Sequence, residues 1–226
     1  CLVMPQPKTN HGCYQDIAVL AFPTPMMTQR IGSLDVKTLA NNAFQRHLMP
    51  SLREVPDSAV VHQADIVDLT DQMQPGGTLA WEAPEGRWTI LRFGFTPTGM
   101  TNHPALAGGN GLECDKMSRK ALDAFWAGGI QPIIDRLGPL VGTGLTGSLI
   151  DSYEVGCGNW TPGFENEFKA RRHYDLKLFL PAMAGYYVES GPVAERFLWD
   201  LRLTVGELMA ENYYDYFAEL CKKHGM

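Results

Sequence analysis

Two carboxylates stand at the end of a short apolar run in residues 149–164, LIDSYEVGCGNWTPGF. Asp151 and Glu154 follow Leu149 and Ile150, and a loop with two glycines and a tryptophan comes next. A carboxylic acid can donate or accept a proton in general acid–base catalysis, and a carboxylate can also bind a cation. The stretch is therefore either one edge of an active site or a capped loop.

Three helices are predicted around this stretch. The first begins with Ser118 as its N-cap residue and carries apolar side chains at helical spacing as far as residue 137. The second begins with Thr161 as the N-cap residue and Pro162 at the first helical position. The third is long, because apolar residues recur at intervals of three and four over residues 193–224.

Residues 148–153 are predicted to form a strand between the first two helices. In a β/α barrel the catalytic groups lie at the carboxyl ends of the parallel strands, which is where Asp151 and Glu154 would lie. Side chains alternate along a strand, so two residues three positions apart point to opposite sides unless the strand has already ended. We therefore expect only one of the two carboxylates to face a pocket.

The first half of the chain is predicted to be rich in strands. Residues 16–22, DIAVLAF, form a buried strand that we assign as a second parallel strand of the barrel. Residues 64–98 are predicted to form antiparallel strands, with turns at 75–77 and 84–86. Both faces of 88–93 carry apolar residues, as expected of a sheet that is packed on two sides.

A long polar loop, residues 98–116, connects this strand-rich unit to the first helix. Loops of this length in compact domains are often functional. Glu113 and Asp115 are its candidate site residues, and Asn102 and His103 are weaker ones. Asp115 is either an acid at the start of the following helix or a contact for a substrate or calcium ion.

Composition limits the possible classes of function. The 226 residues are 45% hydrophobic and 19% charged, which is typical of a globular protein. A net charge of −6 without a basic stripe argues against nucleic-acid binding. The five cysteines contain no CxxC pair, so neither a zinc site nor a disulfide framework is indicated. No apolar run is long enough to predict a membrane span.

Four motifs lie in a fixed order along the chain: GRWTILRFGFTPTG at 86–99, TNHPA and GNGLECDK within 101–116, IDSYEVG followed by NWTPGFENEFKARRHYDLKLFLPAMAG at 150–185, and ERFLWDLRLTVGELMAENYYDYF at 195–217. Together they resemble glycoside hydrolase family 106, the α-L-rhamnosidases. The resemblance implies a (β/α)8 barrel with β-rich additions, calcium dependence, and hydrolysis of α-L-rhamnosides with inversion. It also implies a periplasmic or extracellular location. Members of the family are several times longer, so we expect this chain to be an internal piece that is inactive alone.

An inverting glycosidase needs one carboxylic acid to protonate the leaving oxygen and one carboxylate to activate water. The resemblance makes Glu154 the candidate general acid, with Asp151 beside it disfavouring its ionisation. The alternatives for Glu154 are a loop cap and a calcium ligand. The second carboxylate is expected beyond Met226, with Glu113 and Asp115 as the alternatives within the chain.

Trp160 and Asn159 follow these carboxylates and suit a carbohydrate substrate. An indole ring stacks on the C–H face of a sugar, and an amide can hydrogen-bond hydroxyl groups. The alternative for Trp160 is a place in the hydrophobic core.

The predicted fold class is α/β, a partial (β/α)8 barrel with a small antiparallel β-rich insertion. Residues 1–63 form a barrel segment with one strand, 64–98 the insertion, and 99–226 the barrel segment with the candidate site. Three functions fit this sequence: a piece of an α-L-rhamnosidase, a piece of a related barrel glycosidase with another sugar preference, or a non-catalytic carbohydrate-binding module.

Overall fold

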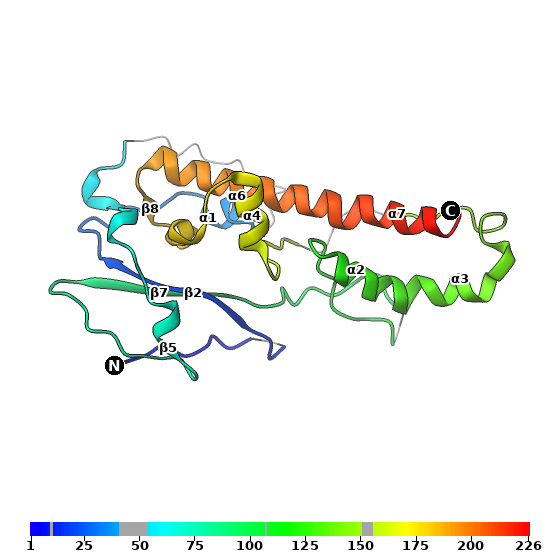
Figure 1. Ribbon diagram of the computed structural model, residues 1–226, viewed down its shortest axis with the longest axis horizontal. Coiled ribbons are helices and arrows are strands. Elements are labelled where there is room, and N and C mark those ends of the chain that lie inside the picture. The colour runs from blue at the N-terminus through cyan, green and yellow to red at the C-terminus, as the bar shows by residue number, and fades with distance from the viewer. Residues whose placement is uncertain (10, 41–53, 107, 151–155) are drawn as a thin grey trace.

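The computed structural model describes residues 1–9, 11–40, 54–106, 108–150 and 156–226. A long helix runs along the length of the molecule, with the paired strands β2 and β7 below its first half and helices α2 and α3 below its second half (Figure 1). The strands are β1 (Leu2–Val3), β2 (Gln15–Pro23), β3 (Val60–Val61), β4 (Val67–Asp68), β5 (Met73–Gln74), β6 (Thr78–Leu79), β7 (Trp88–Phe95) and β8 (Tyr187–Val188).

The helices are α1 (Leu34–Lys37), α2 (Arg119–Phe125), α3 (Gln131–Leu137), α4 (Phe164–Arg172), α5 (Leu180–Met183), α6 (Gly191–Met209) and α7 (Tyr216–Lys223). Two π-helical segments, Trp126–Ile130 and Ala210–Asp215, join α2 to α3 and α6 to α7. Single 3-10 turns are found at Asp57–Ala59, Gln63–Asp65, Thr70–Gln72, Gly138–Leu140 and Lys177–Phe179. The chain is thus a mixed α/β protein with small antiparallel sheets.

The main sheet has the order β4-β2-β7, and both of its pairs are antiparallel. The strand predicted at 16–22 is confirmed, but its assignment as a parallel barrel strand is wrong. An antiparallel strand that is buried on both faces gives the same continuous apolar run as a parallel one, so the sequence could not separate the two. The antiparallel strands predicted within 64–98 are confirmed by β4, β5, β6 and β7.

Both faces of this sheet are packed, as the alternation in 88–93 predicts. Ala18 and Leu20 of β2 point into the main hydrophobic core, together with Phe93 of β7. Val19 and Ala21 point to the opposite side, into a smaller apolar cluster. Because Ala18, Val19, Leu20, Ala21 and Phe22 are all buried, β2 anchors the sheet on which the candidate site is built.

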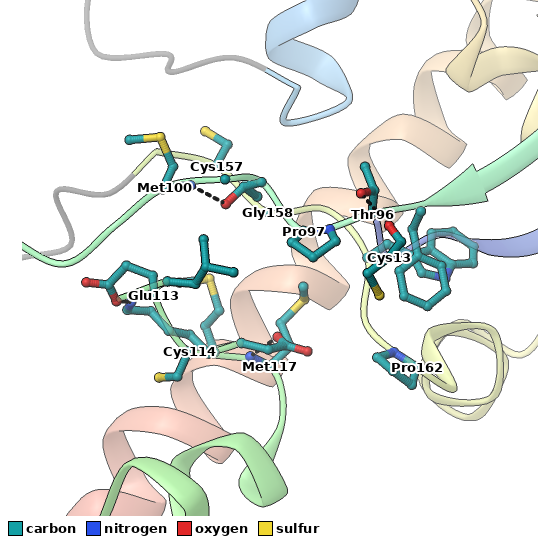
Figure 2. A pocket seen from close by; sticks show the side chains of 18 residues that line it. Cys13, Thr96, Pro97, Met100, Glu113, Cys114, Met117, Cys157, Gly158 and Pro162 are labelled. Atoms are coloured by element: carbon teal, nitrogen blue, oxygen red, sulfur yellow. Dashed lines mark hydrogen bonds and ion pairs between the residues drawn. The ribbon is translucent and has the colours of Figure 1, made fainter. Parts of the chain in front are cut away.

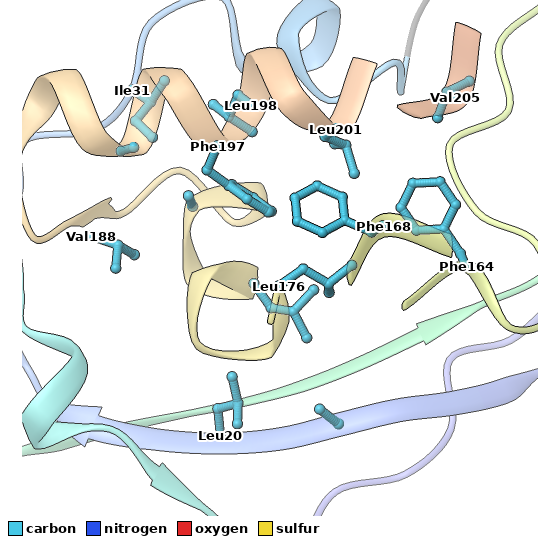
Figure 3. Packing of buried hydrophobic residues seen from close by; sticks show 14 of the residues in the cluster. Leu20, Ile31, Phe164, Phe168, Leu176, Val188, Phe197, Leu198, Leu201 and Val205 are labelled. Atoms are coloured by element: carbon cyan, nitrogen blue, oxygen red, sulfur yellow. The ribbon is translucent and has the colours of Figure 1, made fainter. Parts of the chain in front are cut away.

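The predicted helix at 193–224 is confirmed by α6, the π-helical segment and α7, which follow one another from 191 to 223. Ser190 caps its start, accepting a hydrogen bond from the backbone N–H of Val193 at 3.3 Å. In the main core, Phe197 and Leu201 of α6 pack against Phe168 of α4 (Figure 3). In a second core, Leu122 and Trp126 pack with residues of α7.

Two N-cap residues were predicted from the sequence, and the structure confirms one of them. Ser118 caps α2 as predicted, accepting a hydrogen bond from the backbone N–H of Ala121 at 3.4 Å. The cap predicted at Thr161 is wrong, because α4 begins at Phe164 with Gly163 as the N-cap residue. The Thr161 hydroxyl is instead hydrogen-bonded to a residue of the long polar loop, as described below.

The structure contains no barrel among the residues it describes. Residues 148–150, the start of the strand predicted at 148–153, are not in a strand, and residues 151–155 lie outside the described part. Strands β3 and β8 pair in parallel, with Val60 opposite Tyr187 and Val61 opposite Val188. These two-residue strands were not predicted.

Candidate functional site

Two adjoining pockets lie where β7 ends, between the loop that leads to α2 and the loop that leads to α4. The small pocket, of about 300 Å³, is bounded by residues 95–100, 112–117, 157–158, 160 and 162, together with Cys13 and Met209. The large pocket, of about 660 Å³, adds residues 17, 39–40, 93–94, 156, 159, 180 and 183 to the shared wall. In Figure 2, Met100 and Cys157 lie on one side of the small pocket, and Glu113, Cys114 and Met117 on the other.

The long polar loop is held in shape by Asn102. Its side-chain amide donates a hydrogen bond to the carbonyl of Gly109 at 3.1 Å, and its Oδ1 accepts one from the N–H of Gly111 at 2.7 Å. The backbone also pairs Thr101 with Leu112. Asn102 is thus hydrogen-bonded within its own loop and does not line either pocket, and neither does the exposed His103.

Glu113 and Asp115 both line the small pocket, and both have protein partners. Glu113 accepts a hydrogen bond at 2.6 Å from Lys116, whose side chain is largely buried. Asp115 accepts one at 2.5 Å from the Thr161 hydroxyl and one at 3.0 Å from the N–H of Met117. Asp115 therefore joins the start of α2 to the loop before α4.

Trp160 and Asn159 lie side by side along the loop before α4. Trp160 is half-buried, its ring packs at 4.9 Å from that of Phe164, and it lines both pockets. Asn159 lines the large pocket and donates a hydrogen bond from Nδ2 to the carbonyl of Thr38 at 2.7 Å. This hydrogen bond uses the amide nitrogen of Asn159. The amide oxygen of the same side chain can accept a hydrogen bond from a ligand.

Asp151 and Glu154 lie outside the described residues. Gly156 is the first described residue after them, and Gly156, Cys157 and Gly158 line the large pocket. The four candidates at the pockets are therefore Glu113, Asp115, Asn159 and Trp160, and their roles stay predictions.

Sequence reasoning missed the residues that supply most of the pocket wall. Three cysteines, Cys13, Cys114 and Cys157, line the small pocket. Burial raises the pKa of the Cys114 and Cys157 thiols, so both are neutral at physiological pH and poor nucleophiles. Thr96 and Thr98 line both pockets. Their position directly after a long strand is the signal that could have identified them.

Clusters of metal-ligating side chains were the feature sought for the calcium ion that the resemblance implies. Within 1–9, 11–40, 54–106, 108–150 and 156–226, no group of three or more His, Cys, Asp or Glu side chains is arranged to hold a metal ion. The carboxylates that line the pockets, Glu113 and Asp115, already bind Lys116 and Thr161. The same ranges contain no helix that is long and apolar enough to span a membrane.

Comparisons with known proteins agree on one family. A family model described as alpha-L-rhamnosidase, glycoside hydrolase family 106, matches residues 3–226. A curated relative from Formosa agariphila, named "Putative beta-glucuronidase", is 54% identical over 223 residues, which are 99% of this chain. A solved rhamnosidase structure from Novosphingobium sp. PP1Y is 36% identical, with a TM-score of 0.69 over 76% of this chain.

The chain spans 19% of the length of the Formosa relative and 17% of the Novosphingobium structure. The match to the family model nevertheless extends over almost all of its residues, and it includes both loops that form the pockets. The chain therefore belongs to glycoside hydrolase family 106, the alpha-L-rhamnosidase family.

Proposed function

We propose that this chain forms part of the active site of an inverting glycoside hydrolase that removes terminal α-L-rhamnosyl residues from glycans. The observation that carries the proposal is the family match over residues 3–226. Nearly complete coverage by one family model supports glycosidase chemistry more strongly than a match confined to the β-rich unit would. We also propose that this chain forms part of a (β/α)8 barrel. The rest of the barrel would come from regions of the longer relatives that lie outside this chain.

Glu154 is the proposed general acid in this reaction. It protonates the glycosidic oxygen as the bond to the anomeric carbon breaks, while a second carboxylate removes a proton from the water that attacks the opposite face. In inverting enzymes the two carboxyl groups lie roughly 6.5–9.5 Å apart, which leaves room for that water. Asp151 is proposed to disfavour ionisation of Glu154 and so keep it protonated.

The large pocket is the proposed site of the sugar. Trp160 offers an aromatic surface there, and the amide oxygen of Asn159 and the threonines after β7 offer hydrogen-bonding groups. A sugar ring can stack on the indole while its hydroxyl groups bind these polar atoms. The calcium ion that the resemblance implies stays a prediction, and no step above depends on it. An exported location likewise stays a prediction.

A β-glucuronidase is a second candidate, because the name of the Formosa relative points to one. A glucuronide carries a carboxylate, and its recognition favours a cationic side chain. Among the described residues that line the two pockets, Lys116 is the sole lysine or arginine, and it is paired with Glu113 at 2.6 Å. The described wall therefore suits a neutral sugar better than a uronic acid.

The test is Glu154→Gln in a full-length family member that carries this sequence, because the isolated chain is expected to be inactive. Removing a general acid should lower kcat/KM for methyl α-L-rhamnoside, whose alkoxide leaving group must be protonated, by ~10²–10⁴-fold. Glu85→Gln, in an exposed turn, is the matched control and should leave the rate unchanged. Turnover of an aryl β-glucuronide instead would favour the second candidate. Binding of rhamnosides without any turnover would favour a non-catalytic carbohydrate-binding module.

A further inference from the structure

Leu39 lines the large pocket from an unusual backbone conformation. Its φ is 54°, in the left-handed region, directly after the end of helix α1. The N–H of Leu39 donates to the carbonyl of Val36 at 3.2 Å, and the N–H of Ala40 donates to that of Asp35 at 2.8 Å. These two hydrogen bonds form a Schellman turn, whose left-handed position is usually occupied by glycine. A leucine there costs free energy, because its Cβ crowds the backbone.

Helix α6 and the loop before α4 hold this turn in place. Asn159 of that loop donates a hydrogen bond from Nδ2 to the carbonyl of Thr38 at 2.7 Å. Arg202 of α6 donates one from Nη1 to the carbonyl of Lys37 at 2.8 Å. The ammonium group of Lys37, which is 2% exposed, pairs with Glu195 of α6 at 2.5 Å. A strained backbone persists where the surrounding structure fixes it, and such strain is concentrated at functional sites.

The large pocket is apolar around the leucine side chain. Leu39 is half-buried and shares the pocket wall with four apolar side chains from β2, β7 and α5: Ile17, Phe93, Leu180 and Met183. Among the described residues that line this pocket, none has a charged side chain. A hydroxyl or carboxylate of a sugar placed against the apolar side chains would lose hydrogen bonds to water without recovering them. A methyl group would lose none and would bury apolar surface.

We infer that Leu39 is a specificity-determining residue of the large pocket. Its side chain favours a glycosyl unit that presents a methyl group over one that carries a hydroxymethyl group or a carboxylate at the same carbon. The strained backbone then has a functional reason, since glycine would relax the turn but leave this part of the wall without a side chain. The inference rests on the proposed function, in which the large pocket holds the sugar.

The first experiment measures the strain by urea unfolding of the 226-residue chain. Leu39→Gly and Leu39→Ala both remove the isobutyl group, but only glycine adopts a positive φ without cost. Leu39→Gly should therefore unfold at a higher urea concentration than Leu39→Ala. Val36, which is buried within helix α1, is the matched control, and there Val36→Gly should unfold at a lower urea concentration than Val36→Ala. The same order at both positions would overturn the inference.

The second experiment measures specificity in a full-length family member that carries this sequence. Methyl α-L-rhamnoside and methyl α-L-mannoside differ by one hydroxyl group, on C6. The unmodified enzyme should prefer the rhamnoside in kcat/KM by ~10–200-fold, and Leu39→Gly should reduce this preference by ~10-fold. Val36→Ala should keep the preference, because Val36 lines neither pocket. A purely structural role of Leu39 would change the stability of the enzyme but not the ratio between the two substrates.

The outcomes separate this inference from the function on which it rests. Hydrolysis of the rhamnoside with an unchanged preference in Leu39→Gly overturns the assignment of Leu39 and leaves the proposed function intact. Hydrolysis of neither glycoside by the unmodified enzyme overturns the proposed function, and the assignment with it. A preference that is reduced in Leu39→Gly and kept in Val36→Ala supports both.

Discussion

Asp115 lines the small pocket, and its hydrogen bonds also give it a structural role. Its two carboxylate oxygens accept hydrogen bonds from the Thr161 hydroxyl and the N–H of Met117. Thr161 is 46 positions away in sequence and almost fully buried. Removing the carboxylate would leave both donors without their acceptor.

We predict that Asp115→Ala lowers the free energy of unfolding by roughly 1–3 kcal/mol, because a buried donor is left unsatisfied. Asp71→Ala, at an exposed position, should change it by less than about 0.5 kcal/mol. Urea unfolding measures both. Equal stability of the two variants would mean that the Asp115 carboxylate contributes no net stability.

The elements of the main sheet are joined by an ion pair as well as by the strand ladder. Arg92 of β7 donates hydrogen bonds from Nε and Nη2 to the two carboxylate oxygens of Asp16 in β2, at 2.7 and 2.8 Å. These hydrogen bonds from Arg92 hold the pKa of Asp16 below its ordinary value. The half-exposed position of the carboxylate limits how much this pair contributes.

Because the folded-state pKa of Asp16 is lowered, its stabilising contribution is present above the unfolded pKa of about 3.9 and is lost as the pH falls through the lower folded pKa. We predict that Asp16→Asn is less stable than the unmodified chain at neutral pH and loses less of its stability between about pH 5 and about pH 2. Asp71→Asn is the control and should follow the unmodified profile. Identical pH profiles for Asp16→Asn and the unmodified chain would contradict the prediction.

Helix α6 supplies the largest part of the main core. Phe197 is 1% exposed, its ring stacks on Phe179 at 5.3 Å between centroids, and it packs at 5.9 Å from Phe168. We predict that Phe197→Ala lowers the free energy of unfolding by about 3–5 kcal/mol, since it removes a buried ring and leaves a cavity. Leu203→Ala, on the exposed side of the same helix, should cost less than about 1 kcal/mol when measured by the same urea titration.

The helices and strands that could be predicted from the sequence are those long enough to repeat an apolar pattern. The helix at 191–223 and the strands at 15–23 and 88–95 each repeat their apolar pattern several times. A strand of two residues, such as β3 or β8, contains no repeat and could not be recognised. The same limit applies to the site, because the bond from Asn159 to Thr38 joins residues 121 positions apart, and no local pattern encodes it.

On the scale of the whole molecule, the long helix is apolar on more than its core-facing side. Trp199, Leu203 and Tyr214 lie on its outer side and are 55%, 39% and 41% exposed. Gly206 and Ala210, between Leu203 and Tyr214, are exposed too. The guanidinium of Arg202 lies 5.8 Å from the centre of the Trp199 ring, at one end of this outer stripe. A helix that is apolar on two sides is typical of one covered by further structure.

We expect this outer stripe to be covered in longer family members, because the chain spans only about a fifth of the length of its relatives. In the isolated chain it should drive concentration-dependent self-association, since exposed apolar patches promote contacts between molecules. Sedimentation velocity over a dilution series measures the association, and Leu203→Glu should shift the distribution towards monomer by placing a charge in the stripe. Glu219→Gln, on the exposed side of α7, is the control and should leave the distribution unchanged. A chain that stays monomeric at all concentrations would show that the stripe is tolerated in water, and the exposure of Trp199 would then need no covering structure.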